Sequence, residues 1–288
     1  MKPSICLFGL LVLVNGPVSA GSIHIDGDLN DWISKPDNTS ADWGRLIRPA
    51  STRFVSEDQG DAYLNPGWGG QAYDAEAFYL EIAGKTLYLA IVTGLPPNNS
   101  EYRPGDVAFD FGSDGRYEYG LVVTGERSIN DRWGSGIGKA GDLFSVTEWN
   151  VGLWDGPNDD HDLRSPHSDY QKAHPTSVRN GTLLGNIGAE QLIYRPATYT
   201  SDRTKPLTNK LGGLGGKHYV FEAAVPINLF KDDWGKEFSM HWTMGCNNDF
   251  IEIDAPSTVP EPTSVSMIGL GLVGMLGRRR LARRKRGT

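Results

Sequence analysis

Apolar and polar side chains alternate along much of the middle of this chain. Between residues 238 and 246, Phe, Met, Trp, Met and Cys occupy every second position, with Ser, His, Thr and Gly between them. Residues 107–111 and 117–123 repeat the alternation on either side of a Ser-Asp-Gly sequence at 113–115, which is typical of a hairpin turn. Because successive side chains of a strand point to opposite faces, these segments predict strands with one buried face.

Other segments extend this prediction to most of the chain. Residues 86–92 are apolar at almost every position, which predicts a central strand buried on both faces. Residues 226–231 predict one helical turn that begins with Pro226, whereas residues 154–209 are polar, weakly periodic and predict long loops. Further strands are predicted at residues 22–26, 77–83, 142–149, 218–226 and 250–253. We therefore expect an all-β fold, a single jelly-roll-like β-sandwich with long loops.

The first twenty residues belong to a different physical class. Lys2 is their only charged residue, residues 5–14 form a short apolar run, and Val-Ser-Ala precedes a strongly polar segment. These features are typical of a secretory signal peptide, so we expect export and cleavage after Ala20. Cys6 leaves with that peptide, which makes an internal disulfide impossible. Cys246 would then lie on the buried face of a strand, where a free cysteine is usually inert.

The C-terminal end is apolar and then strongly basic. Residues 263–277 are fifteen residues without a charge, and seven Lys or Arg residues follow them. A helix of that length covers roughly 22 Å at ~1.5 Å per residue, which is short of the ~30 Å hydrocarbon core. It would span only if the bilayer thins or the flanking residues snorkel, with the basic tail in the cytoplasm. We expect a short transmembrane sorting helix here.

The order of these C-terminal features is informative. Pro260, Glu261 and Pro262, the Gly-rich apolar stretch and the Arg cluster resemble the PEP-CTERM sorting signal of Gram-negative bacteria. The resemblance implies that a membrane-embedded exosortase recognises residues 260–288 and removes them near the Pro-Glu-Pro sequence. The protein would be anchored transiently and then delivered to the cell surface or the extracellular matrix. An ordinary C-terminal membrane anchor is the alternative.

Residues 21–259 make up the predicted β-sandwich domain, and they are acidic. They contain 20 Lys and Arg against 34 Asp and Glu, a net charge of −14, whereas the whole chain carries −7. Recognition of nucleic acid begins with a basic surface, so nucleic acid is not an expected partner. The composition suits a soluble extracellular module.

Two short sequences within this domain carry a second resemblance. IDGDLNDW at residues 25–32 is similar to the opening strand and turn of family 9 carbohydrate-binding modules and their DOMON-like relatives. MGCNND at residues 244–249 resembles an ending found in other exosortase-targeted surface proteins, which more often has Gly at the position of Asn247. The resemblance implies a β-sandwich that binds saccharide. It does not place the aromatic sugar-binding residues of that family on this chain.

Saccharide-binding surfaces need flat apolar faces, so tryptophans in loops are the candidates for contact with a sugar. Trp68, Trp133 and Trp154 lie among Gly, Pro and Asp, where a large side chain has no obvious core role. The alternative is that each closes one end of the sandwich and hydrogen-bonds its indole N–H. We expect core positions on strands, or a capping position, for three others: Trp149, Trp242 and Trp32.

Acidic side chains gather in two predicted loops. Asp26, Asp28 and Asp31 form the first cluster, and the second contains Asp155, Asp159, Asp160 and Asp162. Calcium takes six to eight oxygen ligands in irregular geometry, so either cluster is a candidate calcium site, although neither has EF-hand spacing. The alternative is turn and cap chemistry. The spacing of His161, His167 and His174 does not match a zinc motif, and we expect loop residues there.

No motif in the chain predicts catalysis. The sequence nearest to a serine nucleophile elbow, at residues 132–136, has Trp where Gly is needed, and no phosphate-binding loop occurs. A carboxylate pair for glycoside hydrolysis stays open, because many acidic residues are available. The sequence therefore predicts a non-enzymatic protein that binds exopolysaccharide. A structural matrix protein without a small ligand and a glycan-active hydrolase are the alternatives.

Overall fold

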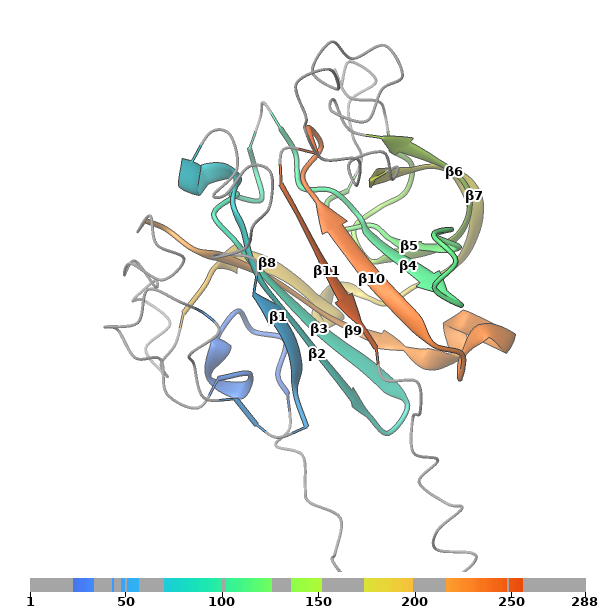
Figure 1. Ribbon diagram of the computed structural model, residues 1–288, viewed down its shortest axis with the longest axis horizontal. Coiled ribbons are helices and arrows are strands. Elements are labelled where there is room, and N and C mark those ends of the chain that lie inside the picture. Colours follow the sequence, from blue (N-terminus) through green and yellow to red (C-terminus); the bar gives the residue numbers. More distant parts are fainter. Residues whose placement is uncertain are drawn as a thin grey trace, which may run out of the picture.

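The computed structural model describes residues 23–33, 43, 48–49, 51–56, 70–99, 102–125, 136–151, 174–198, 216–247 and 249–255. Within these ranges the chain folds into two antiparallel β-sheets and a few short 3-10 helices (Figure 1). The described strands thus confirm an all-β architecture built mainly from the alternating segments of the sequence.

The first sheet has five strands, and its centre is the strand that is apolar on both faces. The strand order is β1 (Arg53–Ser56), β2 (Ala75–Ala83), β3 (Thr86–Thr93), β9 (Tyr219–Pro226) and β8 (Leu192–Pro196). β2 and β3 form a hairpin across Gly84, whose φ of 61° lies in the left-handed region that glycine adopts without strain.

The second sheet has six strands. Their order is β11 (Phe250–Asp254), β10 (Phe238–Thr243), β4 (Val107–Phe111), β5 (Tyr119–Leu121), β6 (Asp142–Val151) and β7 (Pro175–Asn186). The predicted hairpin connects β4 and β5, and its turn contains Ser113 at a φ of 52°. β4 to β7 follow one another as a meander, which places β6 and β7 at one margin of the molecule (Figure 1).

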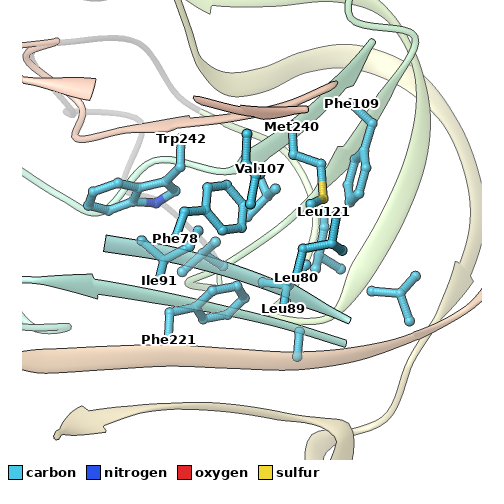
Figure 2. Close-up of a cluster of buried hydrophobic side chains, with 14 of the residues drawn as sticks. Phe78, Leu80, Leu89, Ile91, Val107, Phe109, Leu121, Phe221, Met240 and Trp242 are labelled. Atoms are coloured by element: carbon cyan, nitrogen blue, oxygen red, sulfur yellow. The ribbon is translucent and has the colours of Figure 1, made fainter. Parts of the chain in front are cut away.

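The two sheets pack face to face over one apolar core. Figure 2 shows the core-facing side chains of both sheets pointing toward one another. From the five-stranded sheet these are Phe78, Leu80, Leu89, Ile91 and Phe221. From the six-stranded sheet they are Val107, Phe109, Leu121, Met240 and Trp242. The alternation in the sequence thus corresponds to the inner faces of a sandwich.

Two local predictions were wrong, and the start of a third differs by one residue. Residues 154–209 were expected to be loops, but they contain β7 and β8. β7 was missed because it begins with four buried residues and continues with an exposed half rich in Gly and Asn, so it has no constant period. Residues 23–26 form no strand, and only Asp28 makes an isolated bridge, to Thr198. The helical turn is η8 (Ile227–Asp233), which begins one residue later than expected, after Pro226.

The N-terminal segment covers the outer face of the five-stranded sheet. A short helix, η1 (Leu29–Asp31), brings Trp32 down onto Tyr79 of β2, with ring centroids 6.1 Å apart. The Trp32 indole Nε1–H donates to Glu222 Oε1 at 2.9 Å. Glu222 Oε2 also accepts the backbone N–H groups of Asp26, at 2.9 Å, and Gly27, at 2.7 Å. This confirms that Trp32 caps the sandwich.

A second buried carboxylate on the same face holds the next tryptophan. Trp43 Nε1 donates to Glu76 Oε2 at 2.6 Å, and the other Glu76 oxygen lies 2.8 Å from His218 Nδ1. Glu76, His218 and Trp43 are all fully buried. The outer face of this sheet is therefore closed by polar contacts to the N-terminal segment, and it offers no exposed apolar surface at these positions.

The segment before β11 joins the two sheets. Asp249 Oδ2 accepts the backbone N–H of Ala75 at 2.7 Å, and Asp249 Oδ1 accepts that of Phe250 at 2.9 Å. Burial raises the pKa of Asp249 to about 7, because the ionised form loses its hydration. Asn247 has a φ of 54°, a conformation that asparagine tolerates and glycine prefers. That conformation explains why this position suits glycine.

Candidate functional site

The outer face of the six-stranded sheet contains a groove with a cavity volume of about 470 Å³. This volume lies within the range of small-ligand sites in proteins. The lining residues come from the β4–β5 turn, from β6 and from the start of β7: Gly115, Arg116, Tyr117, Glu118, Val146, Thr147, Trp149 and Pro175. The groove therefore contains two aromatic side chains, a carboxylate, a guanidinium group and a threonine hydroxyl.

Trp149 is fixed on the sheet by a hydrogen bond and by close packing against a glycine. Its indole Nε1–H donates to the carbonyl oxygen of Tyr117 at 2.8 Å. A Cβ built on Gly120 would lie 2.7 Å from Trp149 Cη2 and 2.4 Å from a methyl group of Val178, so the indole crosses β5 where only glycine leaves room. The side chain stays half-buried. A ring held in this way loses little conformational entropy when a ligand stacks on it.

The prediction that Trp149 belongs to the main core was wrong. Leu143 points into the core between the sheets, and strict alternation along β6 would place Trp149 on the same side. The β6–β7 ladder shifts register between Val146 and Glu148 and again between Glu148 and Trp149. These irregularities move Trp149 to the outer face, where it packs beside Val122, Phe144 and Val178. The prediction for Trp242 is confirmed, since that side chain is fully buried in the main core.

Glu118 contributes a partly buried carboxylate to the groove. Its Oε2 accepts the backbone N–H of Phe111 at 2.8 Å. Burial raises the pKa of Glu118 above its usual value, and the nearby carboxylates of Asp110 and Asp114 act in the same direction. The carboxyl group, the Thr147 hydroxyl and the Arg116 guanidinium can together hydrogen-bond the hydroxyl groups of a ligand that stacks on the aromatic rings.

Two histidines lie beside the groove on the same face of the sheet. The His241 ring lies 5.6 Å from that of Tyr117 and 5.2 Å from that of His174, and His174 stacks on Phe250 at 4.3 Å. His241 is fully buried, and neither of its ring nitrogens has a hydrogen-bond partner within the described part of the chain. Burial and the neighbouring His174 lower the pKa of His241 well below its usual value, so this imidazole is neutral.

A group of carboxylates stands on the β4–β5 turn. Oxygens of Asp110, Asp114 and Glu118 lie within 4.8 Å of one another, so these residues could supply ligands to a hard cation. Backbone groups of the turn already occupy them. Asp110 accepts the N–H groups of Asp114 and Gly115, and Asp114 accepts that of Arg116. Turn chemistry accounts for the cluster.

The first acidic cluster proposed for calcium is also explained by local hydrogen bonds. Asp26 Oδ1 accepts the N–H of Asp28 at 2.9 Å, and Asp28 Oδ1 accepts that of Asn30 at 3.1 Å. Asp31 Oδ2 accepts the N–H of His24 at 2.8 Å. These contacts match the alternative prediction of turn and cap chemistry, and they fix the path of the N-terminal segment.

Several predicted site residues lie outside the described residues and stay predictions. They are the cleavage position Ala20, the motif Pro260, Glu261 and Pro262, the tryptophans Trp68, Trp133 and Trp154, and the acidic residues Asp155, Asp159, Asp160 and Asp162. The apolar segment at residues 263–277 also lies outside them. No helix among the described residues is long and apolar enough to cross a membrane. The structure thus adds a site that sequence reasoning had not singled out.

Comparison with known proteins identifies the C-terminal segment. Residues 258–280 match the family described as the PEP-CTERM protein-sorting motif. No curated protein and no solved structure matches the chain. The resemblance of the domain to family 9 carbohydrate-binding modules is therefore not confirmed.

The fold and the motif together define the class of protein. It is a two-sheet, all-β protein that is exported and then sorted through its C-terminal segment. The motif at residues 258–280 supports a PEP-CTERM protein, one whose sorting involves an exosortase.

Proposed function

We propose that this exported protein is a non-catalytic saccharide-binding module, and that the groove over Tyr117 and Trp149 is its binding site. The ligand is a polysaccharide of the cell surface or the extracellular matrix, where sorting would deliver the protein. The C-terminal segment would anchor the chain in the membrane transiently, until an exosortase removes it near Pro260–Pro262. The single observation that carries the binding proposal is the fixed position of the Trp149 indole in an open groove.

Sugar chemistry fits the composition of this groove. A pyranose ring presents C–H groups on its faces and hydroxyl groups around its edge. The faces of Tyr117 and Trp149 match the C–H groups, and Arg116, Glu118 and Thr147 match the hydroxyl groups. Because the groove runs along the surface of a sheet, a polymer could enter and leave it without a free chain end. That property suits a polysaccharide better than a small metabolite.

Affinity gel electrophoresis tests the proposal. A protein of residues 21–259 contains both sheets and the N-terminal segment that covers one of them. We would run it through gels that contain hydroxyethylcellulose, laminarin, dextran, xanthan or alginate, with calcium and with a chelator. The proposal predicts retardation in at least one polysaccharide gel. Abolition by chelator would show that the binding also needs a cation.

A matched pair of variants locates the site. Thr147→Arg places a long side chain in the groove from an exposed position on β6, so it should abolish retardation. Asn98→Arg introduces the same arginine side chain at an exposed position that does not line the groove, and it should leave retardation unchanged. Both variants must melt cooperatively near the wild-type temperature. Equal retardation of both variants would reject the groove, and the absence of retardation in every gel would reject saccharide binding.

A further inference from the structure

The four edges of the two sheets differ in how they are protected. Isolated proteins commonly blunt an open edge with a short strand, a charged side chain, a proline or a β-bulge. β1 has only four residues, β8 ends in Arg195 and Pro196, and β11 exposes Glu252 and Asp254. β7 has twelve residues, which makes it the longest described strand. Its length therefore gives β7 no protection as an edge strand.

Among the described residues, segments other than β6 form backbone hydrogen bonds with the first part of β7 only. The carbonyl oxygen of Thr176 accepts the N–H of Asp106, and that of Val178 accepts the N–H of Ile137. Beyond Val178, within the described ranges, the backbone of residues 179–185 hydrogen-bonds to β6 alone. Figure 1 shows β7 at the outer margin, beyond β6. Within the part of the chain that the structure describes, the second half of β7 therefore presents an open row of backbone donors and acceptors.

The exposed half of β7 is uncharged and carries an exposed apolar side chain. Residues 180–186 read NGTLLGN and contain no ionisable group, in a domain whose net charge is −14. Leu183 is 52% exposed, which makes it the most exposed large hydrophobic side chain among the described residues. It pairs with Phe144 of β6, so it extends the apolar surface of the outer face toward the edge. Two such edges could meet without repulsion between like charges.

The same segment is almost a palindrome about Leu183. If a second copy pairs with it in the antiparallel direction, Leu183 lies opposite Leu183 of that copy. Gly181 then lies opposite Gly185, and Asn180 opposite Asn186. Only the Thr182 and Leu184 pair joins different residue types, and Leu184 is also the residue that the β6–β7 ladder skips between Leu183 and Gly185. An edge that is complementary to itself favours a two-fold symmetric interface with another copy over an unrelated peptide.

We infer that two copies of this protein associate through β7, with residues 180–186 of each strand paired antiparallel about Leu183. The pairing continues the six-stranded sheet of one copy into that of the other. It also covers the exposed leucine side chains with each other. The register shifts between β6 and β7 strengthen the local twist and keep the paired segment short. The dimer is therefore weak and depends on protein concentration.

Sedimentation velocity over a hundredfold range of concentration tests this inference. The protein of residues 21–259 should shift from monomer toward twice the monomer mass as its concentration rises. Leu183→Arg should hold it at the monomer mass throughout, because two charges would meet at the symmetry axis. Asn98→Arg, with the same added charge at an exposed position outside β7, should associate like the wild type. Association that Leu183→Arg does not change would overturn the inference, as would a wild-type protein that is monomeric throughout.

A crosslinking pair tests the register. In a Leu183→Cys variant the two new thiols lie directly opposite each other, and diamide should oxidise them to an intermolecular disulfide. In a Thr182→Cys variant the two thiols are offset along the strands, so crosslinking should be several-fold slower. The unsubstituted protein of residues 21–259, whose one cysteine is the buried Cys246, controls for background. Faster crosslinking at position 182 would overturn the proposed register. The groove variant Thr147→Arg should still dimerise, so failure of saccharide binding and failure of dimerisation can be told apart.

Discussion

Trp149 and Tyr117 are joined by a hydrogen bond from the indole Nε1–H to the Tyr117 carbonyl oxygen, at 2.8 Å. This bond links β6 to Tyr117, which precedes the start of β5 by two residues. It holds two aromatic side chains on one open groove. The arrangement is therefore the basis of the saccharide-binding proposal, and the following predictions test it and the fold that supports it.

Gly120→Ala should displace the Trp149 indole. The added methyl group would overlap Val178 Cγ2 and Trp149 Cη2, and overpacking of this kind typically costs about 1–3 kcal/mol of stability. Urea unfolding measures that loss, and the emission of Trp149 should shift as its surroundings change. Gly125→Ala is the control, because its nearest neighbour would lie at 3.5 Å, an ordinary contact distance. Equal stability of the two variants would show that the indole does not rest on Gly120.

Glu222 should make the protein less stable at alkaline pH. Burial raises its pKa from 4.5 to about 8, although three N–H donors oppose the rise. The folded state therefore holds the proton more tightly than the unfolded chain does. The resulting stabilisation is present below the unfolded pKa and is lost as the pH rises through about 8. Asp249, with a pKa raised to about 7, acts in the same sense.

The unfolding free energy should accordingly be higher at pH 6 than at pH 9. Glu222→Gln keeps the size of the side chain but cannot ionise, so it should narrow the difference between the two pH values. Chemical denaturation at both pH values, for wild type and variant, provides the measurement. If the unfolding free energies of wild type and variant changed equally with pH, Glu222 would stay ionised throughout this range. The effect of its three N–H donors on its pKa would then outweigh the effect of burial.

His241→Phe should be neutral or stabilising by up to about 1 kcal/mol, because it removes two buried nitrogens that lack partners among the described residues. The pKa of His241 is lowered, so the unfolded chain takes up a proton below about pH 6.5 and the folded state does not. Stability contributed by this residue is therefore lost as the pH falls. The increase in unfolding free energy caused by His241→Phe should be larger at pH 5 than at pH 8. A loss of stability at both pH values would indicate that the imidazole has a partner.

Cys246 should not react until the protein unfolds. It is 4% exposed and belongs to the main core, so its predicted burial is confirmed, although it lies in the turn after β10 and not on the strand. Its labelling by Ellman's reagent should follow the rate of global unfolding in urea. Rapid labelling under native conditions would favour the alternative in which this cysteine links chains in a matrix.

The sequence predicted best where a strand alternates without interruption. β4, β10 and β11 fall close to the predicted positions, because each has one face against the core. β7 escaped prediction because its two halves lie in different surroundings, one buried and one exposed. The four-residue strand β1 carries too few positions to show a period.

The groove was harder to predict than the fold. Trp149 lies on its outer face because of register shifts in the β6–β7 ladder, and nothing in the sequence of β6 alone marks a bulge. Gly120 lies against the indole, but it indicates the position of Trp149 only once the pairing of β5 with β6 is known. A buried acid could have been found, since Glu222 interrupts a strand that is otherwise apolar on both faces.

The most direct test of the saccharide-binding proposal observes the eight tryptophan indole N–H groups by ¹⁵N nuclear magnetic resonance. Cellohexaose, laminarihexaose and an alginate hexamer would be titrated into the labelled protein of residues 21–259, with Trp149→Phe used to assign the groove resonance. The account predicts that one of these oligosaccharides shifts the Trp149 indole signal and leaves those of the buried Trp32 and Trp242 in place. Shifts confined to the indoles of Trp68, Trp133 or Trp154 would place the site elsewhere and contradict it.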